Sequence, residues 1–207
     1  MEQLDKTGPI YHIAPKRSGH VMVMNMIKSW CPHRRYYELE NKHPKFQIEN
    51  GVKVLQTRDF LNWFASYVYG KDRHKYQYNT KPIQMWYRIT KIIYNGTKGM
   101  IPIIFDDFVI NKNYRMEICA QLDGKYNEDT LLQVNNNGDG SSFDGQKYDG
   151  RANEMNVLTR YKQIDPDLYL KFFTAYPYYL RLYRRICTDE EKIEFLESIG
   201  AWQIVST

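Results

Sequence analysis

The chain lacks the cysteine patterns that mark metal sites and disulfide frameworks. Its 207 residues include only three cysteines, Cys31, Cys119 and Cys187. They lie too far apart for a CxxC pair or a mixed Cys/His zinc motif. An odd number of widely spaced cysteines favours reduced, buried thiols, so we expect a reducing compartment and no bound metal.

Long apolar segments are missing too. No run approaches the roughly 20 apolar residues that a membrane-spanning helix needs. The N-terminal stretch MEQLDKTG is too polar for a secretory signal. These absences predict a cytoplasmic protein without a membrane span.

Neither sign of charge dominates strongly. The net charge is +5, and charged residues make up 26% of the chain. Such a small excess suits an anionic ligand but gives no reason to expect nucleic acid as a partner. The hydrophobic content of 43% is enough for a core, and we expect a single α/β domain over residues 1–207.

The chain is organised around the stretch PIYHIAPKRSGHVMVMNMIKS near its start. Residues 9–14 are a short apolar run typical of a strand, and residues 15–20 interrupt it as a polar turn. Residues 21–27 are apolar nearly all round, as expected of a helix buried against a sheet. The turn's amides, the helix N-terminus and the charges of Lys16 and Arg17 together favour phosphate binding, although a solvated surface turn is the alternative.

Two familiar phosphate-binding loops do not fit this turn. A Walker A loop carries a lysine directly after its last glycine, whereas His20 follows Gly19 here. A dinucleotide fingerprint needs three spaced glycines, and this turn has one. If the turn binds phosphate, it does so as a different kind of loop.

Strands and helices alternate along the rest of the chain. We expect further strands at residues 35–39, 52–57 and 100–105. We expect further helices at residues 60–69, 82–98, 113–122, 151–163, 166–176, 177–186 and 189–198. This order predicts an α/β three-layer sandwich with a central parallel sheet, a P-loop-like strand-turn-helix unit and a helical C-terminal part.

Polar segments follow the carboxyl ends of the predicted strands, where ligands of parallel sheets bind. They are residues 16–21, residues 58–66 and the strand end near Asp106. The loop at residues 135–150 has the lowest hydrophobicity in the chain and is long enough to reach the same edge. The sequence therefore predicts one site for an anionic ligand at this edge.

Three motifs, in order, resemble those of the P-loop sulfotransferase superfamily. Residues 15–20, PKRSGH, are similar to that family's 5′-phosphosulfate loop. Residues 57–66, TRDFLNWFAS, are similar to its 3′-phosphate motif, and residues 138–143, GDGSSF, to its late glycine-rich loop. The resemblance covers about residues 9 to 165.

The resemblance implies an enzyme that uses 3′-phosphoadenosine 5′-phosphosulfate (PAPS) as co-substrate and releases adenosine 3′,5′-bisphosphate (PAP). The sulfuryl group would pass in line to a hydroxyl or amine acceptor without a metal. The residues assigned to the 5′ side are Lys16, Arg17, Ser18, Gly19, His20 and Val21. Those assigned to the 3′ phosphate and the rest of the nucleotide are Arg58, Ser66, Ser141, Ser142 and Phe143.

The chain departs from the family at three of these motif positions. Many members carry hydroxyl side chains where His20 and Val21 stand, and proline where Phe60 stands. The loss of the two hydroxyl groups removes side-chain donors from the 5′ side of the nucleotide.

The resemblance also assigns catalytic roles. The cation that stabilises the bridging oxygen would be Arg17 or, one position earlier, Lys16. Glu38, Glu40 and His43 compete for the general base, because the family places a Glu or His just after its second strand. The short segment between the first two motifs favours a large or flat acceptor, such as a saccharide, over a small buried phenol.

Two alternatives stay open. A nucleotide or small-molecule kinase on a P-loop fold would need Mg²⁺ and a Walker lysine. A non-catalytic nucleotide- or glycan-binding module would keep the fold and the site without turnover.

Overall fold

The computed structural model describes residues 7–39, 50–69, 80–134, 144 and 146–205. Its four-stranded parallel sheet has the order β2-β1-β3-β4. The strands are β1 (Ile10–Ile13), β2 (Tyr36–Glu38), β3 (Val52–Thr57) and β4 (Met100–Ile104). The α/β class and the parallel sheet are therefore confirmed, and the order reverses between β1 and β3, where parallel sheets open a crevice for ligands.

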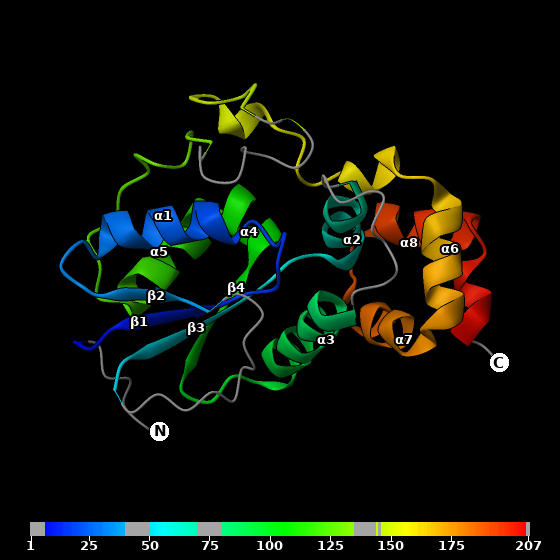
Figure 1. Ribbon diagram of the computed structural model, residues 1–207, viewed down its shortest axis with the longest axis horizontal. Helices are drawn as coiled ribbons and strands as arrows, with labels where there is room; N and C mark the ends of the chain where they lie inside the picture. Colours follow the sequence, from blue (N-terminus) through cyan, green and yellow to red (C-terminus); the bar gives the residue numbers. More distant parts are fainter. Residues whose placement is uncertain (1–6, 40–49, 70–79, 135–143, 145, 206–207) are drawn as a thin grey trace.

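Helices cover both faces of this sheet (Figure 1). The α-helices are α1 (His20–Trp30), α2 (Phe60–Tyr69), α3 (Thr80–Asn95), α4 (Phe105–Ile110), α5 (Lys112–Gln121), α6 (Pro166–Ala175), α7 (Pro177–Ile186) and α8 (Glu190–Ser198). Three short 3-10 helices are η1 (Ala152–Glu154), η2 (Arg160–Gln163) and η3 (Ala201–Val205). In Figure 1, α1, α4 and α5 lie on one face and α3 on the other, while α2 and α6–α8 lie beyond the carboxyl ends of the strands.

Side chains that alternate between the two faces of each strand build the two layers of the hydrophobic core. Ile10 and Val54 pack with Met26 of α1 in one cluster. Ile13, which points to the opposite face, packs with Met85 of α3 in another. The period of two in each strand therefore divides its apolar residues between the two helical layers.

A third cluster, rich in aromatic residues, joins α2 to the C-terminal helices. Phe60 lies at its centre, with ring centroids 4.7 Å from Trp86 and 5.2 Å from Phe173. Edge and tilted ring pairs of this kind add to the free energy of apolar burial. The C-terminal helices thereby fix α2, which begins directly beyond the end of β3.

The predicted helix at residues 151–163 is wrong, because that segment contains only η1 and η2. Its carbonyl groups bind elsewhere: Val157 O accepts from Arg58 at 2.5 Å, and Leu158 O accepts from Asn62 at 2.6 Å. In an α-helix these two carbonyls would accept from the amides four residues later. Side-chain donors from α2 and the end of β3 therefore replace the helical bonds.

Helix α4 was not predicted, since the sequence indicated a polar strand end there. The predicted strand at 100–105 stops at Ile104, and Phe105 begins α4. Asp106 and Asp107 lie in the first turn of α4, where negative charge is favoured by the helix dipole. The Asp106 carboxylate is thus held on a helix rather than on a loop.

Candidate functional site

The turn between β1 and α1 has an uncommon backbone. Arg17 and Gly19 both have positive φ, 68° and 79°, and Ser18 between them does not. Backbone of alternating hand is found in anion-binding nests, although here the amide of Ser18 donates to Pro15 O at 3.3 Å within the turn. Gly19 is the N-cap of α1, and within the described residues no side chain caps that helix end. The turn and the helix dipole therefore offer a favourable place for an anion.

Two side chains hold this turn in place. The indole Nε1 of Trp63 donates to Lys16 O at 2.8 Å, and Nε2 of Gln56 donates to Ser18 O at 2.7 Å. Both bonds engage carbonyl groups, which would repel an anion if they faced it. Side chains of β3 and α2 therefore hold the turn in place through its carbonyl groups.

The residues predicted for the 5′ side differ in exposure. Ser18 is buried, and its Oγ lies 3.4 Å from Nε2 of Gln56. Lys16 is exposed, whereas Arg17 and Val21 are partly buried. Ser18 is thus part of the folded turn, and the two basic side chains are nearer to solvent.

Phe105 connects this turn to the end of β3. A Cβ added at Gly19 would lie 2.2 Å from the Phe105 ring, so glycine is required for this close approach. The guanidinium carbon of Arg58 lies 5.0 Å from the centroid of the same ring. The two predicted phosphate-binding segments therefore pack against one side chain.

Two buried arginines meet at one serine. Ser66 Oγ accepts from Arg58 at 3.0 Å and lies 3.4 Å from Nη1 of Arg160. The three residues are 1%, 3% and 5% exposed for Ser66, Arg58 and Arg160, respectively. The carboxylate of Asp144 pairs with Arg160 at 3.2 Å. We call Arg58, Ser66 and Arg160 the arginine cluster.

The arginine cluster has the electrostatics of an anion site. Burial lowers the pKa of Arg58, and burial together with the charge of Arg58 lowers the pKa of Arg160 to about 10. Nε of Arg58 has no hydrogen-bond partner in the described part of the chain. An anion beside the two guanidinium groups would offset the repulsion between their charges and the free-energy cost of their desolvation.

Arg160 is a buried residue of the candidate site that the sequence motifs did not include. It lies in η2, in the sequence Arg-Tyr-Lys-Gln, which matches none of the motifs. Asn62 brings it into place, because Oδ1 of Asn62 accepts from Tyr161 N at 3.4 Å. The one feature of the sequence that could have pointed to Arg160 is that it is a basic residue shortly after the long polar loop at residues 135–150.

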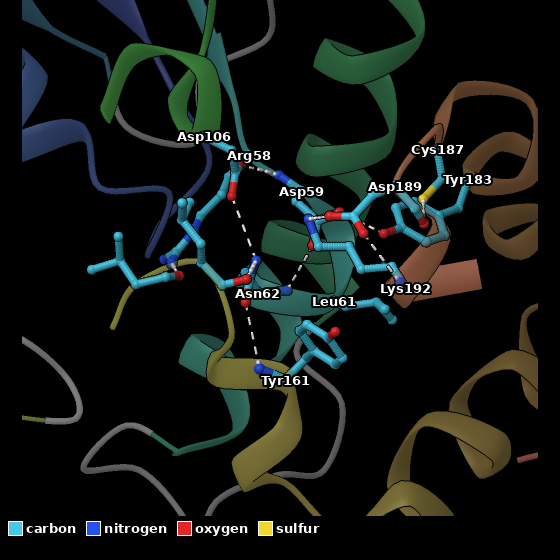
Figure 2. Close-up of polar contacts among 12 residues, drawn as sticks. Arg58, Asp59, Leu61, Asn62, Asp106, Tyr161, Tyr183, Cys187, Asp189 and Lys192 are labelled. Atoms are coloured by element: carbon cyan, nitrogen blue, oxygen red, sulfur yellow. Dashed lines mark hydrogen bonds and ion pairs between the residues drawn. The ribbon is translucent and has the colours of Figure 1, made fainter. Parts of the chain in front are cut away.

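Asp59 and Asp106 lie next to Arg58, but among the described contacts neither carboxylate forms an ion pair with it. Asp106 Oδ2 instead accepts from the Asp59 amide at 2.7 Å. Asp59 Oδ2 accepts from the Tyr183 hydroxyl at 2.5 Å and pairs with Lys192 at 3.4 Å (Figure 2). Arg58 is consequently left to bind Ser66 and a backbone carbonyl.

Asp59 lies directly before the first residue of α2. Its Oδ1 accepts from the amide of Asn62 at 3.0 Å, the expected bond of a helix N-cap. Helix α2 thereby starts at the end of β3 and presents Ser66 two turns later. Asp59, Asn62 and Ser66 follow one another along one face of α2, a polar side that is largely buried.

Of the three candidates for general base, the structure describes Glu38. It is the last residue of β2, and its Oε1 lies 2.6 Å from Nε2 of His20, the first residue of α1. This hydrogen bond lowers the pKa of Glu38, against the effect of its partial burial. A carboxylate with a lowered pKa is a weaker proton acceptor.

The other predicted site residues lie outside the described residues. They are Glu40, His43, Ser141, Ser142 and Phe143. In the part of the chain that the structure does describe, no three His, Cys, Asp or Glu side chains are grouped to hold a metal ion. Over the same residues, none of the helices combines the length and apolarity needed to span a membrane.

The candidate site therefore combines two features that are suited to an anion and that pack against Phe105: the turn before α1 and the arginine cluster. Comparisons of the chain with protein-family models, with curated proteins and with solved structures find no match.

Proposed function

We propose that the protein is a sulfotransferase that moves a sulfuryl group from PAPS to a hydroxyl or amine acceptor, such as one on a saccharide. The observation that carries the proposal is the arginine cluster, a buried, strongly cationic site beside a second anion-binding turn. A nucleotide with phosphates at both its 5′ and 3′ positions has the charge pattern that two such features would select.

The residues present fit such a nucleotide. The nest-like turn and the N-terminus of α1 suit the 5′ phosphosulfate, with Lys16 and Arg17 close by. The arginine cluster suits the 3′ phosphate, since guanidinium groups match the geometry of phosphate oxygens. PAPS would supply an activated sulfuryl group.

In this function the chain acts by position and charge. Lys16 or Arg17 stabilises charge on the bridging oxygen as the sulfur–oxygen bond breaks. The acceptor oxygen or nitrogen forms the new bond to sulfur, its proton passes to a base, and PAP leaves. Glu38 is the described candidate for that base, with Glu40 and His43 as the others.

Thermal unfolding with added nucleotides tests the proposal. PAP, adenosine 5′-phosphate and ATP with Mg²⁺ are compared at equal concentration, with and without EDTA. Ligand that binds the folded state raises stability by about 2.7 kcal/mol at a hundredfold excess over Kd. We expect PAP to raise Tm most, and its effect to be independent of Mg²⁺.

The other outcomes point to the alternatives. A rise in Tm only with ATP and Mg²⁺ would favour the kinase and contradict the sulfotransferase. A rise with PAP, but no PAP release from PAPS across a panel of saccharide, phenol and amine acceptors, would favour the non-catalytic module. No rise with any nucleotide would contradict nucleotide binding at this site.

A further inference from the structure

Lys192 reaches the site from α8, more than 120 residues beyond the end of β3. It is 8% exposed, which is rare for lysine. Its Nζ lies 3.4 Å from Oδ2 of Asp59 and 3.1 Å from Oδ2 of Asp189. Figure 2 shows it beside Asp59, on the side away from Arg58.

Lys192 and Arg58 act on the same pair of carboxylates. Asp59 and Asp106 adjoin each other, and burial and the charge of Asp59 raise the pKa of Asp106. Arg58 and Lys192 are the two cations that oppose this shift. The same carboxylates raise the pKa of Lys192 against the effect of its burial, so Lys192 stays charged.

Arg58 is held by few bonds. It donates to Ser66 Oγ and to Val157 O, and its Nε has no partner in the described residues. A guanidinium binds a carboxylate more strongly than it binds a neutral oxygen. Arg58 would therefore turn to Asp59 and Asp106 if their charge were not already compensated.

We propose that Lys192 is a positioning residue for the 3′-phosphate site: by neutralising Asp59 it leaves Arg58 on Ser66, where Arg58 can bind an anion. This inference rests on the proposed function, because it names the control of that same site. It gives the C-terminal helices a role in nucleotide selection beyond packing.

The test measures how strongly the site selects the 3′ phosphate. Calorimetry gives the two dissociation constants, and the Kd for adenosine 5′-phosphate divided by the Kd for PAP reports the preference for the 3′ phosphate alone. In Lys192→Met we expect this ratio to fall about tenfold or more, mainly through weaker PAP binding. Lys192→Arg keeps the charge and should retain most of the ratio.

Two further variants separate positioning from general damage. Lys171→Met removes the same charge from the exposed surface of α6 and should leave the ratio unchanged. The double variant Asp59→Asn with Lys192→Met removes both partners, while asparagine can still cap α2. It should regain most of the ratio that Lys192→Met loses, because Arg58 no longer faces an uncompensated Asp59.

The outcomes distinguish this inference from the proposed function. If the wild-type protein does not prefer PAP over adenosine 5′-phosphate, the proposed function fails and the inference fails with it. If the wild type prefers PAP and folded Lys192→Met keeps the full preference, the inference alone is overturned. An equal loss for both nucleotides, or no recovery in the double variant, would also overturn it, since either result indicates a merely structural role.

Discussion

At the scale of single residues, burying the charged groups of Arg160 and Arg58 costs free energy, and the need to fold does not explain this cost. Both guanidinium groups are buried, they lie beside the same hydroxyl, and burial lowers the pKa of each. A lowered pKa in an arginine means that the folded state disfavours its charged form. Such groups are typical of sites where stability is traded for binding.

We predict that Arg160→Met lowers the affinity for PAP about tenfold to a hundredfold, because it removes the charge-assisted contact that we propose for the 3′ phosphate. The affinity for adenosine 5′-phosphate should change little. The free energy of unfolding without ligand should also change little, since the charged group is already disfavoured by desolvation and by Arg58. Calorimetry and urea denaturation check these expectations.

Arg181→Met is the matched control for this variant. Arg181 is an exposed residue of α7, so its loss changes the net charge equally without touching the arginine cluster. PAP affinity that is the same in Arg160→Met and in Arg181→Met would contradict the assignment of Arg160 to the site.

At the scale of elements, the turn before α1 depends on Gly19 for two separate reasons. Its φ of 79° is in the left-handed region, and a Cβ there would lie 2.2 Å from Phe105. Gly150 has nearly the same φ, 78°, with no atom within 4 Å of the added Cβ. The pair therefore separates the conformational cost from the steric one.

We predict that Gly150→Ala destabilises the fold by about 1–2 kcal/mol, the cost of a left-handed L-residue. Gly19→Ala should cost clearly more, because Phe105 or the turn must also move. It should also weaken PAP binding, since Phe105 adjoins Arg58. Urea denaturation and calorimetry measure both effects, and equal destabilisation by the two variants would contradict the close packing at Gly19.

The strand-turn-helix units could be predicted because their signals are local. Residues 52–57 and 60–69 were predicted with the bounds that the structure shows. Alternation marks β3, and apolar residues at helical spacing after the N-cap Asp59 mark α2. The bounds, caps and burial of these elements follow from residues that are close together in sequence. For the same reason, the positions of Arg58 and Ser66 could be predicted.

Segments with long-range partners could not be predicted in this way. At residues 151–163 the local pattern favoured a helix, but Arg58 and Asn62 bind the carbonyls that the helix would need. The same bonds place Arg160, so its position beside Arg58 could not be predicted either. Helix α4 has only six residues, too few for a periodic pattern to show.

At the scale of the whole molecule, the sheet carries a buried histidine that links stability to pH. His12 of β1 is 1% exposed, and the hydroxyl of Tyr36 lies 2.5 Å from its Nδ1. Burial, together with the charge of His20, lowers the pKa of His12 from 6.5 to about 3. Between these two values the unfolded chain binds a proton that the folded chain does not bind at His12.

We therefore predict that acid destabilises the protein through His12 from about pH 6.5 downward. In that window His12 lowers the free energy of unfolding by about 1.4 kcal/mol for each unit of pH. His12→Gln, which can still accept from Tyr36, should flatten the dependence. Urea denaturation between pH 7 and pH 5 measures the slope.

The comparison of variants isolates His12 from the carboxyl groups. The raised pKa of Asp106 acts in the opposite direction, since the folded state takes up that proton first as pH falls. Because the pKa of Glu38 is lowered, its ionised form stabilises the folded protein at neutral pH. This stabilisation is lost only as pH falls below the ordinary pKa of glutamate. Asp106 is present in wild type and variant alike, so its contribution cancels in the difference of slopes. The charge of His12 contributes to the lowered pKa of Glu38, but that pKa lies below the measured range of pH 7 to pH 5. His33→Gln, at an exposed position, is the control and should leave the slope unchanged. A slope in His12→Gln equal to that of the wild type would contradict the prediction, because it would mean that His12 takes up its proton in the folded protein.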